Sequence, residues 1–524
     1  MPRGSPVSIE RTIASERLAV PQEHLGVLVE PAAGMLDAMI ASDQSRELGA
    51  VRLLDTSVGE LRTQLRRRFE LAGPVILTGH QAEFDHAGVF AKTVAVDALA
   101  ARSGGSAVFL TVDSDLPRET HVRVPLVERG ELRRELVRIP DCDLELPVEG
   151  QPAVSAAQWR VFFARIAELG GCDDTLLPSY TAGVFGDSES VSDLRSVIGR
   201  GRAAAGRSLG LDDVLDVRMS RLSRTPEVRA FVGHLMLHAR RFAEDYNEAQ
   251  RAYRRRRRVR SPQRPVPLLA SDGRRVELPF WVSRAGQVRR RLLVATRGER
   301  VELFADHELI GSESRCRLRV AEELVGGFQI EGEGWHLWPR ALALSALTRL
   351  FLSDLLVHGI GGANYDEMTE DFTRRFFGVD LPPACCVTAT VRLPLPRHGV
   401  DDRALAAVRH ARHDLHFNPQ RHLPDLPADL LRRRGELIET SERLRKKGRR
   451  DRMARRAAFE QIRAVNRDLL CHDTKRVAEL EQQWRDREHR RRSDRIALDR
   501  EYFFALHPRR TMEELVQRIR AAIA

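Results

Sequence analysis

The chain is 524 residues long, more than one hydrophobic core can organise, so two to four domains are expected. With 42% hydrophobic and 30% charged residues, the composition excludes a chain that is disordered over most of its length. The net charge of +11, carried mainly by arginine, favours an anionic ligand such as a nucleotide, an acidic metabolite or a nucleic acid.

Residues 1–150 predict the N-terminal part of a Rossmann-like core. A first helix is expected from the helical spacing of Leu54, Val58, Leu61 and Leu65. Two buried strands, over 75–78 and 107–113, then flank an amphipathic helix over 89–100. Such a βαβ unit implies parallel strands with a right-handed crossover. Ligands of such sheets bind outside the carboxyl ends of the strands, so the loops after these two strands are the first place to look for a site.

Four further segments follow in the chain. Residues 151–262 predict a helical connecting segment, and 263–335 predict a small β-rich insertion of short alternating strands. Residues 336–424 return to α/β character and predict the C-terminal part of the core, with a glycine-rich loop. Residues 425–524 predict a coiled-coil hairpin followed by C-terminal helices. The predicted class is therefore α/β with a parallel-sheet core.

The hairpin is predicted from apolar residues that repeat at intervals of seven. These are Leu430, Leu437 and Leu444, then Ile462 with Leu469 and Leu470 with Val477. The charged run Lys446–Asp451 separates the two sets. Two charged helices joined by a turn predict an antiparallel coiled coil.

The first candidate site is the strand–loop–helix segment Thr78–Lys92. Glycines allow a phosphate to approach the backbone, a helix N-terminus attracts anions, and a histidine can stabilise developing charge. The residues that carry this interpretation are Thr78, Gly79, His80, Gln81, His86, Gly88 and Lys92. The structural alternative is that Asp85 caps the helix and His80 packs locally.

Two carboxylates follow the second strand, at Asp113 and Asp115. They can hold Mg²⁺, a ribose hydroxyl or an amino group, but Asp-Ser-Asp is also ordinary turn chemistry. A parallel sheet would bring them to the same edge as the first loop.

The third candidate is the segment His358–Asp366, which contains Gly361, Gly362 and Asn364. Its glycines permit close approach to a ligand, and Asp366 can bind or cap. The segment lacks the Gly-Lys-Ser/Thr of a phosphate-binding P-loop and the dinucleotide fingerprint. A helix C-cap followed by an N-cap is the alternative.

Other classes of site are not supported by the sequence. The six cysteines have no disulfide or zinc spacing and are expected to be small core residues in a reducing compartment. The run Arg254–Arg258 is expected to be a solvated helix end, and few aromatic residues interleave with the basic runs. There is no N-terminal apolar signal segment and no apolar stretch near the roughly 18 residues that span a bilayer, which predicts a cytoplasmic protein without a membrane partner.

Taken together, these segments resemble the bacillithiol-biosynthesis cysteine-adding enzymes (BshC), a family of cysteine ligases. Thr78-Gly-His-Gln81 resembles the family's Thr-Gly-Gln-Gln, and Gly88-Val-Phe-Ala-Lys-Thr93 resembles its Gly-Pro-Leu-Tyr-x-x-x-Lys helix. Val112-Asp-Ser-Asp115 and Gly361–Asp366 stand where the family has Glu-Asp-His-Asp and Gly-Gly-Pro-Gly-Glu. His80 thus replaces a glutamine and Ser114 a histidine.

The resemblance implies a Rossmann-like core, a coiled coil that forms a homodimer, and an ATP/ADP-type nucleotide as ligand. The implied reaction joins an amino acid, cysteine in the family, to a small amine or amino sugar. Whether Mg²⁺ takes part is left open.

On this hypothesis, Gly79, His80, His86 and Gly88 hold phosphate with Lys92 as a supporting cation, while Thr78 and Gln81 complete the nucleotide loop. Asp113 and Asp115 bind the substrate amine or a metal. Gly361, Gly362, Asn364 and Asp366 close the pocket. The alternatives are a nucleotidylyltransferase, and a non-catalytic protein whose basic hairpin binds nucleic acid or a partner.

Overall fold

The computed structural model describes residues 13, 18–41, 45–128, 131–170, 174–186, 193–212, 214–261, 266–399, 402–446 and 452–524. The chain divides into two compact units. Unit 1 comprises Met1–Val124, Glu135–Leu393 and Arg500–Ala524, and unit 2 comprises Pro125–Arg134 and Pro394–Asp499. Among the described residues, no helix is both long and apolar enough to cross a bilayer.

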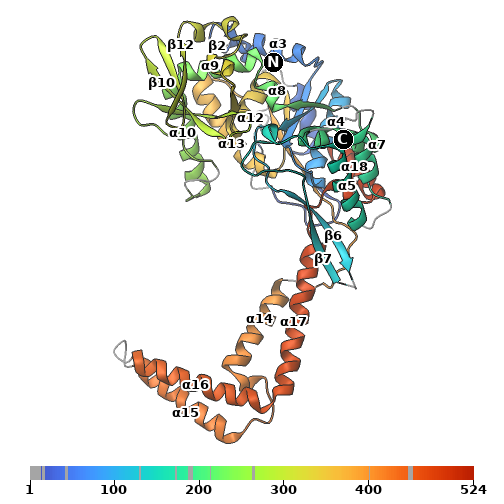
Figure 1. Ribbon diagram of the computed structural model, residues 1–524, viewed down its shortest axis with the longest axis vertical. Coiled ribbons are helices and arrows are strands. Elements are labelled where there is room, and N and C mark those ends of the chain that lie inside the picture. Colours follow the sequence, from blue (N-terminus) through green and yellow to red (C-terminus); the bar gives the residue numbers. More distant parts are fainter. Residues whose placement is uncertain are drawn as a thin grey trace, which may run out of the picture. The chain divides into compact units, whose positions relative to one another are not determined.

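A six-stranded sheet forms the centre of unit 1 (Figure 1). Its order is β1 (Gly26–Glu30), β15 (Ala384–Thr390), β14 (Leu355–His358), β4 (Val75–Gln81), β5 (Ser106–Val112) and β8 (Leu215–Arg218). The strands from β15 to β8 are parallel to their neighbours, and only β1 is antiparallel, to β15. The predicted α/β class is therefore confirmed.

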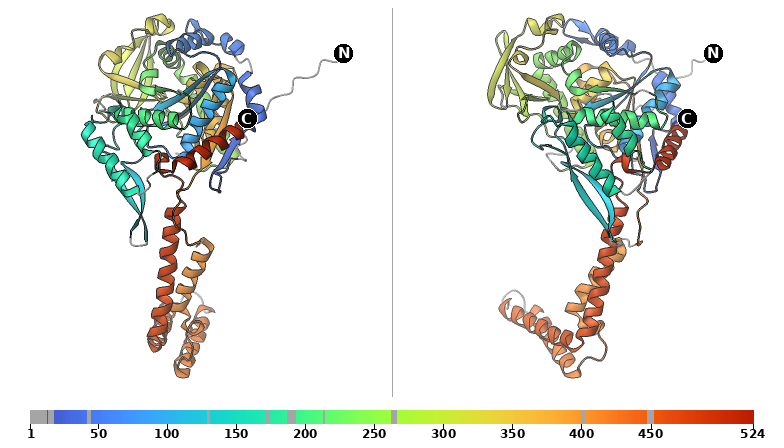
Figure 2. Two further views of the ribbon diagram at one scale, coloured as in Figure 1. Left: turned by 90° about the vertical axis from the view of Figure 1, so that its right-hand side faces the viewer. Right: turned by 45° about the vertical axis from the view of Figure 1, so that its right-hand side comes forward.

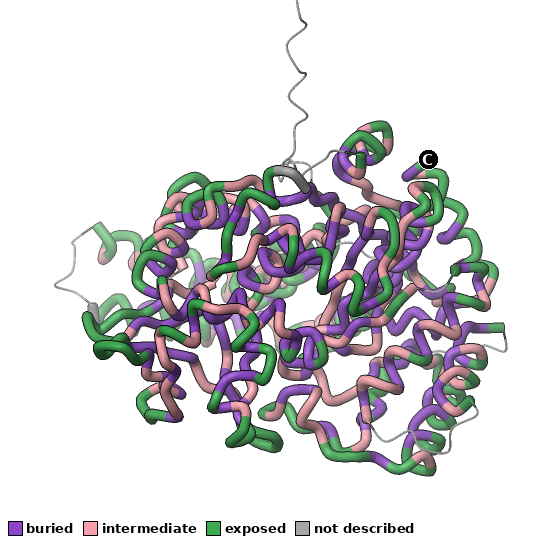
Figure 3. Tube along the Cα trace, turned by 90° about the horizontal axis from the view of Figure 1, so that it is seen from above, coloured by how far each residue is buried: buried purple, intermediate pink, exposed green. Residues whose placement is uncertain are grey.

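Helices cover both faces of this sheet. Helix α4 (Ala87–Ser103) packs on β4, β5, β14 and β15, and α18 (Arg509–Ile523) packs on α4. On the opposite face, Val75 and Leu77 enter a large apolar core with residues of α3, α9, α10, α12 and α13. Figure 3 shows the buried residues gathered in the interior of the trace. Alternation along β4 therefore turns Thr78 and His80 away from that core.

The remaining helices of unit 1 have the following bounds: α1 Ala33–Ala41, α2 Ser45–Ala50, α3 Val58–Arg68, α5 Ala156–Gly170, α6 Leu177–Phe185, α7 Leu194–Ser208, α8 Met219–Leu222, α9 Pro226–Leu237, α10 Ala239–Arg257, α11 Gln329–Gly332, α12 Ala341–Phe351 and α13 Ile360–Phe377. Helix α3 begins at a capping box of Ser57 and Glu60. Leu54, expected in this helix, instead lies in the turn between β2 (Arg52–Leu53) and β3 (Thr56–Ser57) with a φ of 60°.

The β-rich segment is an antiparallel sheet of five strands. Its order is β12 (Glu308–Ser314), β11 (Arg300–Ala305), β10 (Arg290–Arg297), β9 (Val276–Arg284) and β13 (Trp335–Pro339). Strand β8, by contrast, lies within the segment expected to be helical, because a four-residue strand carries too little sequence pattern to be recognised.

Unit 2 contains four helices among its described residues, drawn in orange and red in Figures 1 and 2. They are α14 (Asp402–Phe417), α15 (Ala428–Lys446), α16 (Arg452–His472) and α17 (Thr474–Ala497). Helix α15 packs on α16, and α14 packs on α17. Leu470 and Val477, expected to repeat along one helix, lie on different helices, because α16 ends before Asp473 and Asp473 caps α17. The hairpin β6 (His121–Glu128) and β7 (Glu131–Arg138) is a separate two-stranded sheet.

The cysteines are not all core residues as expected. Cys142, Cys385 and Cys386 are buried, but Cys316 and Cys471 are exposed. Cys172 lies outside the described residues.

Candidate active site

The carboxyl ends of β4 and β14 mark the point where the strand order reverses. From β4 the chain proceeds to β5 and β8 in one direction, whereas β14 and β15 lie in the other. Crevices outside the strands open at such a point in α/β sheets. The segment after β4 and the segment after β14 therefore border the same edge.

A cavity of about 160 Å³ lies beside the loop that follows β4. Its ionisable lining consists of His80, Glu83, Asp85, His86, Arg118, Glu119, His121, Arg123 and Glu501. These groups come from the end of β4 and the β4–α4 loop, from β6 and the segment before it, and from the segment after unit 2. The cavity is thus walled by titratable side chains of three distant parts of the chain.

Glu83 is the carboxylate best suited to proton transfer. Burial raises its pKa to about 7, against the opposing effect of the Arg118 guanidinium. Its Oε1 is buried without a hydrogen bond in the described structure and lies 3.4 Å from Arg118 Nε. A carboxyl group that titrates near neutral pH can both accept and return a proton.

His80 is neutral at neutral pH. Burial, reinforced by the charge of Lys92, holds its pKa well below the ordinary histidine range. Its Nδ1 lies 3.3 Å from the Gln81 carbonyl oxygen and 3.8 Å from Asp85 Oδ1. A proton on Nδ1 suits the contact with this carbonyl and leaves Nε2 as a proton acceptor.

Asp85 does not cap α4, as one interpretation of the sequence expected; His86 does. His86 Nδ1 accepts a hydrogen bond from the Gly88 N–H at 3.0 Å. Burial, aided by Arg500, lowers the pKa of His86 to about 3, so the cap is a neutral ring.

The two glycines of this loop do not provide an open phosphate cradle. A Cβ on Gly79 would lie 2.9 Å from the Leu110 carbonyl oxygen, and one on Gly88 would lie 2.8 Å from that of Ala389. Glycine is required at both positions because neighbouring backbone atoms occupy the space that a side chain would need. The Gly88 N–H, which was expected to hold phosphate, is hydrogen-bonded to His86 instead.

Asp85 is instead part of a buried ion-pair network that sequence reasoning missed. Arg202 Nη1 donates to Asp85 Oδ2 at 3.1 Å, and Arg202 Nη2 donates to Asp216 at 2.7 Å and to Thr111 Oγ1 at 3.1 Å. The guanidinium also lies 3.4 Å from the centroid of the Phe109 ring. Asp85 Oδ1 remains without a hydrogen bond among the described residues and belongs to the cavity wall. Nothing near Arg202 in the sequence marks this role.

Lys92 joins the first loop to the segment after β14. Its Nζ donates to the Gly79 carbonyl oxygen at 2.6 Å, and Thr78 Oγ1 donates to the Val357 carbonyl oxygen at 2.7 Å. A Cβ built on Gly359 would lie 3.8 Å from Lys92 Cδ. Burial lowers the pKa of Lys92 to about 8. Lys92 does not line the cavity. Its contact with this edge of the sheet is the hydrogen bond to Gly79.

Asp113 and Asp115 are occupied by protein groups. Asp113 accepts from the Ser220 N–H at 2.8 Å, from Ser220 Oγ at 2.5 Å and from Arg195 at 3.2 Å, and it is fully buried. Asp115 accepts from Gln81 Nε2 at 2.8 Å and lies 2.7 Å from Arg289 Nη1. The structure brings Gln81 and Asp115 together, but these contacts already satisfy the two carboxylates. No cluster of metal-ligating side chains occurs among the described residues.

The predicted glycine-rich loop is a helix. Residues Ile360–Phe377 form α13, with Gly359 as its N-cap, so Gly361, Gly362, Asn364 and Asp366 all lie in its first turns. Gly359 offers no side-chain cap, and Gly361 and Gly362 are exposed. Three glycines did not prevent a helix here because the strand before it and the packing of α13 fix the backbone.

Asp366 has a structural role on the buried side of α13. Arg349 Nη1 donates to Asp366 Oδ2 at 2.5 Å, and His358 Nε2 lies 3.2 Å from Oδ1. Burial works to raise the pKa of Asp366, but these two partners outweigh it and lower the pKa to about 2. Asp366 therefore holds β14 and α12 to α13 and does not face the cavity.

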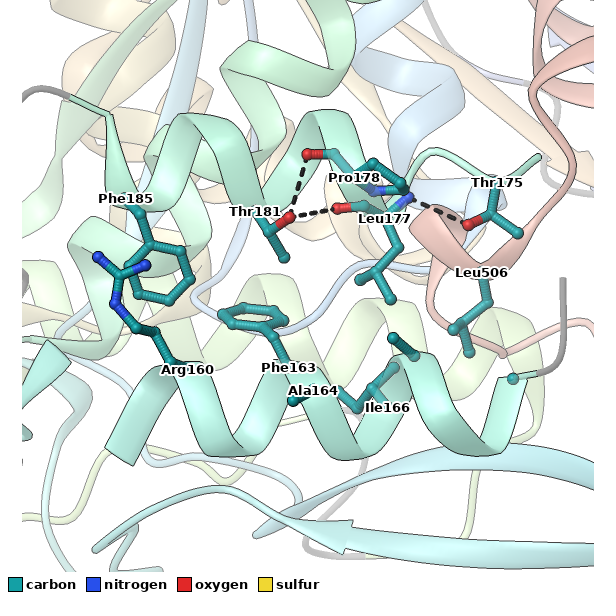
Figure 4. A pocket seen from close by; sticks show the side chains of 12 residues that line it. Arg160, Phe163, Ala164, Ile166, Thr175, Leu177, Pro178, Thr181, Phe185 and Leu506 are labelled. Atoms are coloured by element: carbon teal, nitrogen blue, oxygen red, sulfur yellow. Dashed lines mark hydrogen bonds between the residues drawn. The ribbon is translucent and has the colours of Figure 1, made fainter. Parts of the chain in front are cut away.

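A larger cavity of about 500 Å³ lies between α5 and α6 (Figure 4). Phe163, Ile166, Leu177 and Leu506 point into it, and the Arg160 guanidinium lies 4.4 Å from the centroid of the Phe185 ring. Arg160 is the one ionisable side chain among its described lining residues. The larger cavity thus lacks the acid and base groups that surround His80.

No protein-family model matches this chain, and a search of curated proteins found no match.

Proposed function

We propose that this protein is an amide-forming ligase of the BshC type. It joins an amino acid, cysteine in that family, to a small amine or amino sugar, with an ATP/ADP-type nucleotide assisting. The proposal combines the resemblance of the loops with the chemistry of the cavity beside His80 and Glu83.

The strand order supports a Rossmann-like core. The sequence β8-β5-β4-β14-β15 corresponds to the order 3-2-1-4-5 of doubly wound nucleotide-binding sheets. In such sheets the ligand binds where the order reverses, which here is the edge shared by the β4–α4 loop and the start of α13.

Glu83 and His80 supply the proton transfer that amide formation needs. The amine nitrogen attacks the activated carboxyl carbon, the C–N bond forms and the bond to the leaving group breaks. The nitrogen loses a proton, which passes to the Glu83 carboxylate or to the free nitrogen of His80. A volume of about 160 Å³ is small for a ligand pocket and suits a substrate the size of an amino acid.

The start of α13 fits a nucleotide phosphate better than the start of α4. It has no side-chain cap, its glycines are exposed, and Lys92 lies beside Gly359. Backbone N–H groups of Ile360, Gly361 and Gly362 would hold the phosphate with the positive end of the helix dipole. A bound nucleotide would supply activation of the carboxyl group.

The observation that carries the proposal is the Glu83 carboxyl in the cavity wall beside neutral His80: its pKa is about 7, and its Oε1 has no hydrogen bond among the described residues. A thermal-shift screen with ATP, ADP, amino acids and amines should identify ligands, and mass spectrometry should detect the amide product. For Glu83→Gln, turnover should fall about 10²-fold or more, and the rise of activity with pH through about 7 should disappear.

His80→Ala should also lower turnover, with thermal unfolding nearly unchanged. The matched control is Glu119→Gln, a second carboxyl of the same cavity for which we propose no proton transfer. Full activity and an unchanged pH profile in Glu83→Gln would reject Glu83 as the base. Release of pyrophosphate without any added amine would instead indicate a nucleotidylyltransferase.

A further inference from the structure

Unit 2 carries almost all of the excess positive charge of the chain. It contains 30 Lys and Arg against 20 Asp and Glu, a net charge of +10 out of +11. Unit 1 is therefore nearly neutral, with the acid–base cavity inside it. The charge that the whole sequence suggested for a small anionic ligand belongs to a different part of the molecule.

Three exposed aromatic rings lie in a row within unit 2. His413 and Phe417 on α14 stack with ring centroids 4.4 Å apart and an interplanar angle of 20°. Phe417 and Phe459 on α16 follow at 6.4 Å and 30°. The two phenylalanines are 37% and 44% exposed, although large apolar side chains tend to be buried. The sequence did not reveal this row because Phe459 lies 42 residues after Phe417 and on a different helix.

Arginines flank this row of rings. Arg455, Phe459, Arg463 and Arg467 follow one another at intervals of four residues and so lie along one side of α16. All three arginines are exposed, and no ion pair with another described residue engages them. Some exposed arginines elsewhere in the same unit are paired, such as Arg412 with Glu481 at 3.1 Å, whereas Arg487 and Arg490 on α17 have no ion pair with another described residue. What distinguishes the three α16 arginines is therefore their place beside the rings.

We propose that the rings His413, Phe417 and Phe459, with Arg455, Arg463 and Arg467, form a binding surface for single-stranded nucleic acid. Aromatic rings offer flat faces to unpaired bases, and guanidinium groups bind the phosphates between them. Single-stranded nucleic acid uses both features in alternation, with bases on the rings and phosphates on the guanidinium groups, and we prefer it on this ground to an acidic protein or an anionic membrane. This activity is separate from the ligase reaction proposed for unit 1.

The test measures binding of fluorescent single-stranded RNA and DNA of about 16 nucleotides to the full-length protein by anisotropy. Binding to at least one of them should weaken steeply with salt. The double variant Phe417→Leu with Phe459→Leu should raise Kd by about tenfold or more, with little change in the salt dependence. Reversal of the three α16 arginines to Glu should weaken binding and lower the slope of log Kd against log salt by about 2.

The matched control replaces Arg485, Arg487 and Arg490 on α17 with Glu. This changes the net charge by the same amount but leaves the three rings and the three α16 arginines unchanged. It should bind more tightly than the α16 variant. Equal losses in the two reversal variants, or no loss in the ring variant, would overturn the proposed surface. So would binding to anionic lipid vesicles with none to either oligonucleotide. Circular dichroism checks that each variant is folded, and Phe459→Leu alone serves if the double variant is not.

Discussion

At the scale of single residues, the most unusual group is the buried Lys92. Among the described residues its Nζ has one hydrogen-bond acceptor, the Gly79 carbonyl oxygen, and the residue is 3% exposed. Burial lowers its pKa from 10.5 to about 8. A cationic group held at such a cost is typical of a functional site, where stability is given up for activity.

Lys92→Met should therefore stabilise the protein by about 2 kcal/mol at pH 7, since the desolvation cost exceeds the one hydrogen bond lost. Below pH 8 both the folded and the unfolded chain carry the charge, so the folded state bears the full cost. As pH rises from 8 to 10.5 the folded lysine loses its proton first, and the advantage of the variant should shrink.

Chemical denaturation at pH 7, 8, 9 and 10 measures this trend. The control is Lys475→Met, an exposed lysine of α17 that should show no pH-dependent effect. A less stable Lys92→Met, or an advantage that grows with pH, would show that Lys92 is paired well enough to offset its burial.

The sequence revealed the chemistry of the β4–α4 loop but not its surroundings. His80, His86 and Lys92 could be found because they follow a short apolar strand whose flanking glycines and helix are visible in the sequence. Arg202 and Asp216 could not, because long-range ion pairs leave no local pattern. The lowered pKa of His86 likewise depends on residues far along the chain, because the charge of Arg500 adds to its burial and its backbone pairs with Phe503.

At the scale of elements, the start of α13 depends on two adjacent glycines with different surroundings. A Cβ on Gly362 would lie 2.6 Å from His358 Nδ1, whereas one on Gly361 would meet nothing within 4 Å. Gly362→Ala should push the His358 ring from Asp366 and cost about 1 kcal/mol, even after its gain in helix propensity.

Gly361→Ala is the control and should be neutral or stabilising by up to about 0.5 kcal/mol. Thermal unfolding of both variants checks the difference. Equal stability would mean that the His358 ring moves aside without cost. The sequence predicted a loop here because of the glycines. The helix is anchored by the buried ion pair of Arg349 and Asp366, and such a tertiary contact leaves no local sequence pattern.

At the scale of the whole molecule, the coiled-coil dimer implied by the resemblance can be tested by excision. Truncation near Pro424 would also remove Arg500–Ala524, which belongs to unit 1. Replacing Pro394–Asp499 with a short Gly/Ser linker avoids this loss. The linker can be short because Arg500 Nη1 donates to Thr390 Oγ1 at 3.1 Å, so the two ends of unit 1 lie close together.

The excised protein should remain folded and should be a monomer by light scattering, while the full chain forms a dimer. A dimeric excised protein would place the interface on unit 1. A monomeric full chain would remove the dimer from the proposal altogether.

The α/β class and the β-rich sheet were predictable because strand and helix periods are local, whereas the division into these two units depends on contacts between distant segments.

The position of Arg500–Ala524 also constrains the order in which the protein is built. Phe504 stacks on Phe90 of α4 at 4.4 Å, its N–H donates to the Asp85 carbonyl oxygen, and α18 packs on α4. During synthesis, all of unit 2 emerges from the ribosome before these residues do. Unit 2 can therefore fold while unit 1 still exposes one side of α4, so the wall of the cavity beside His80 is completed last.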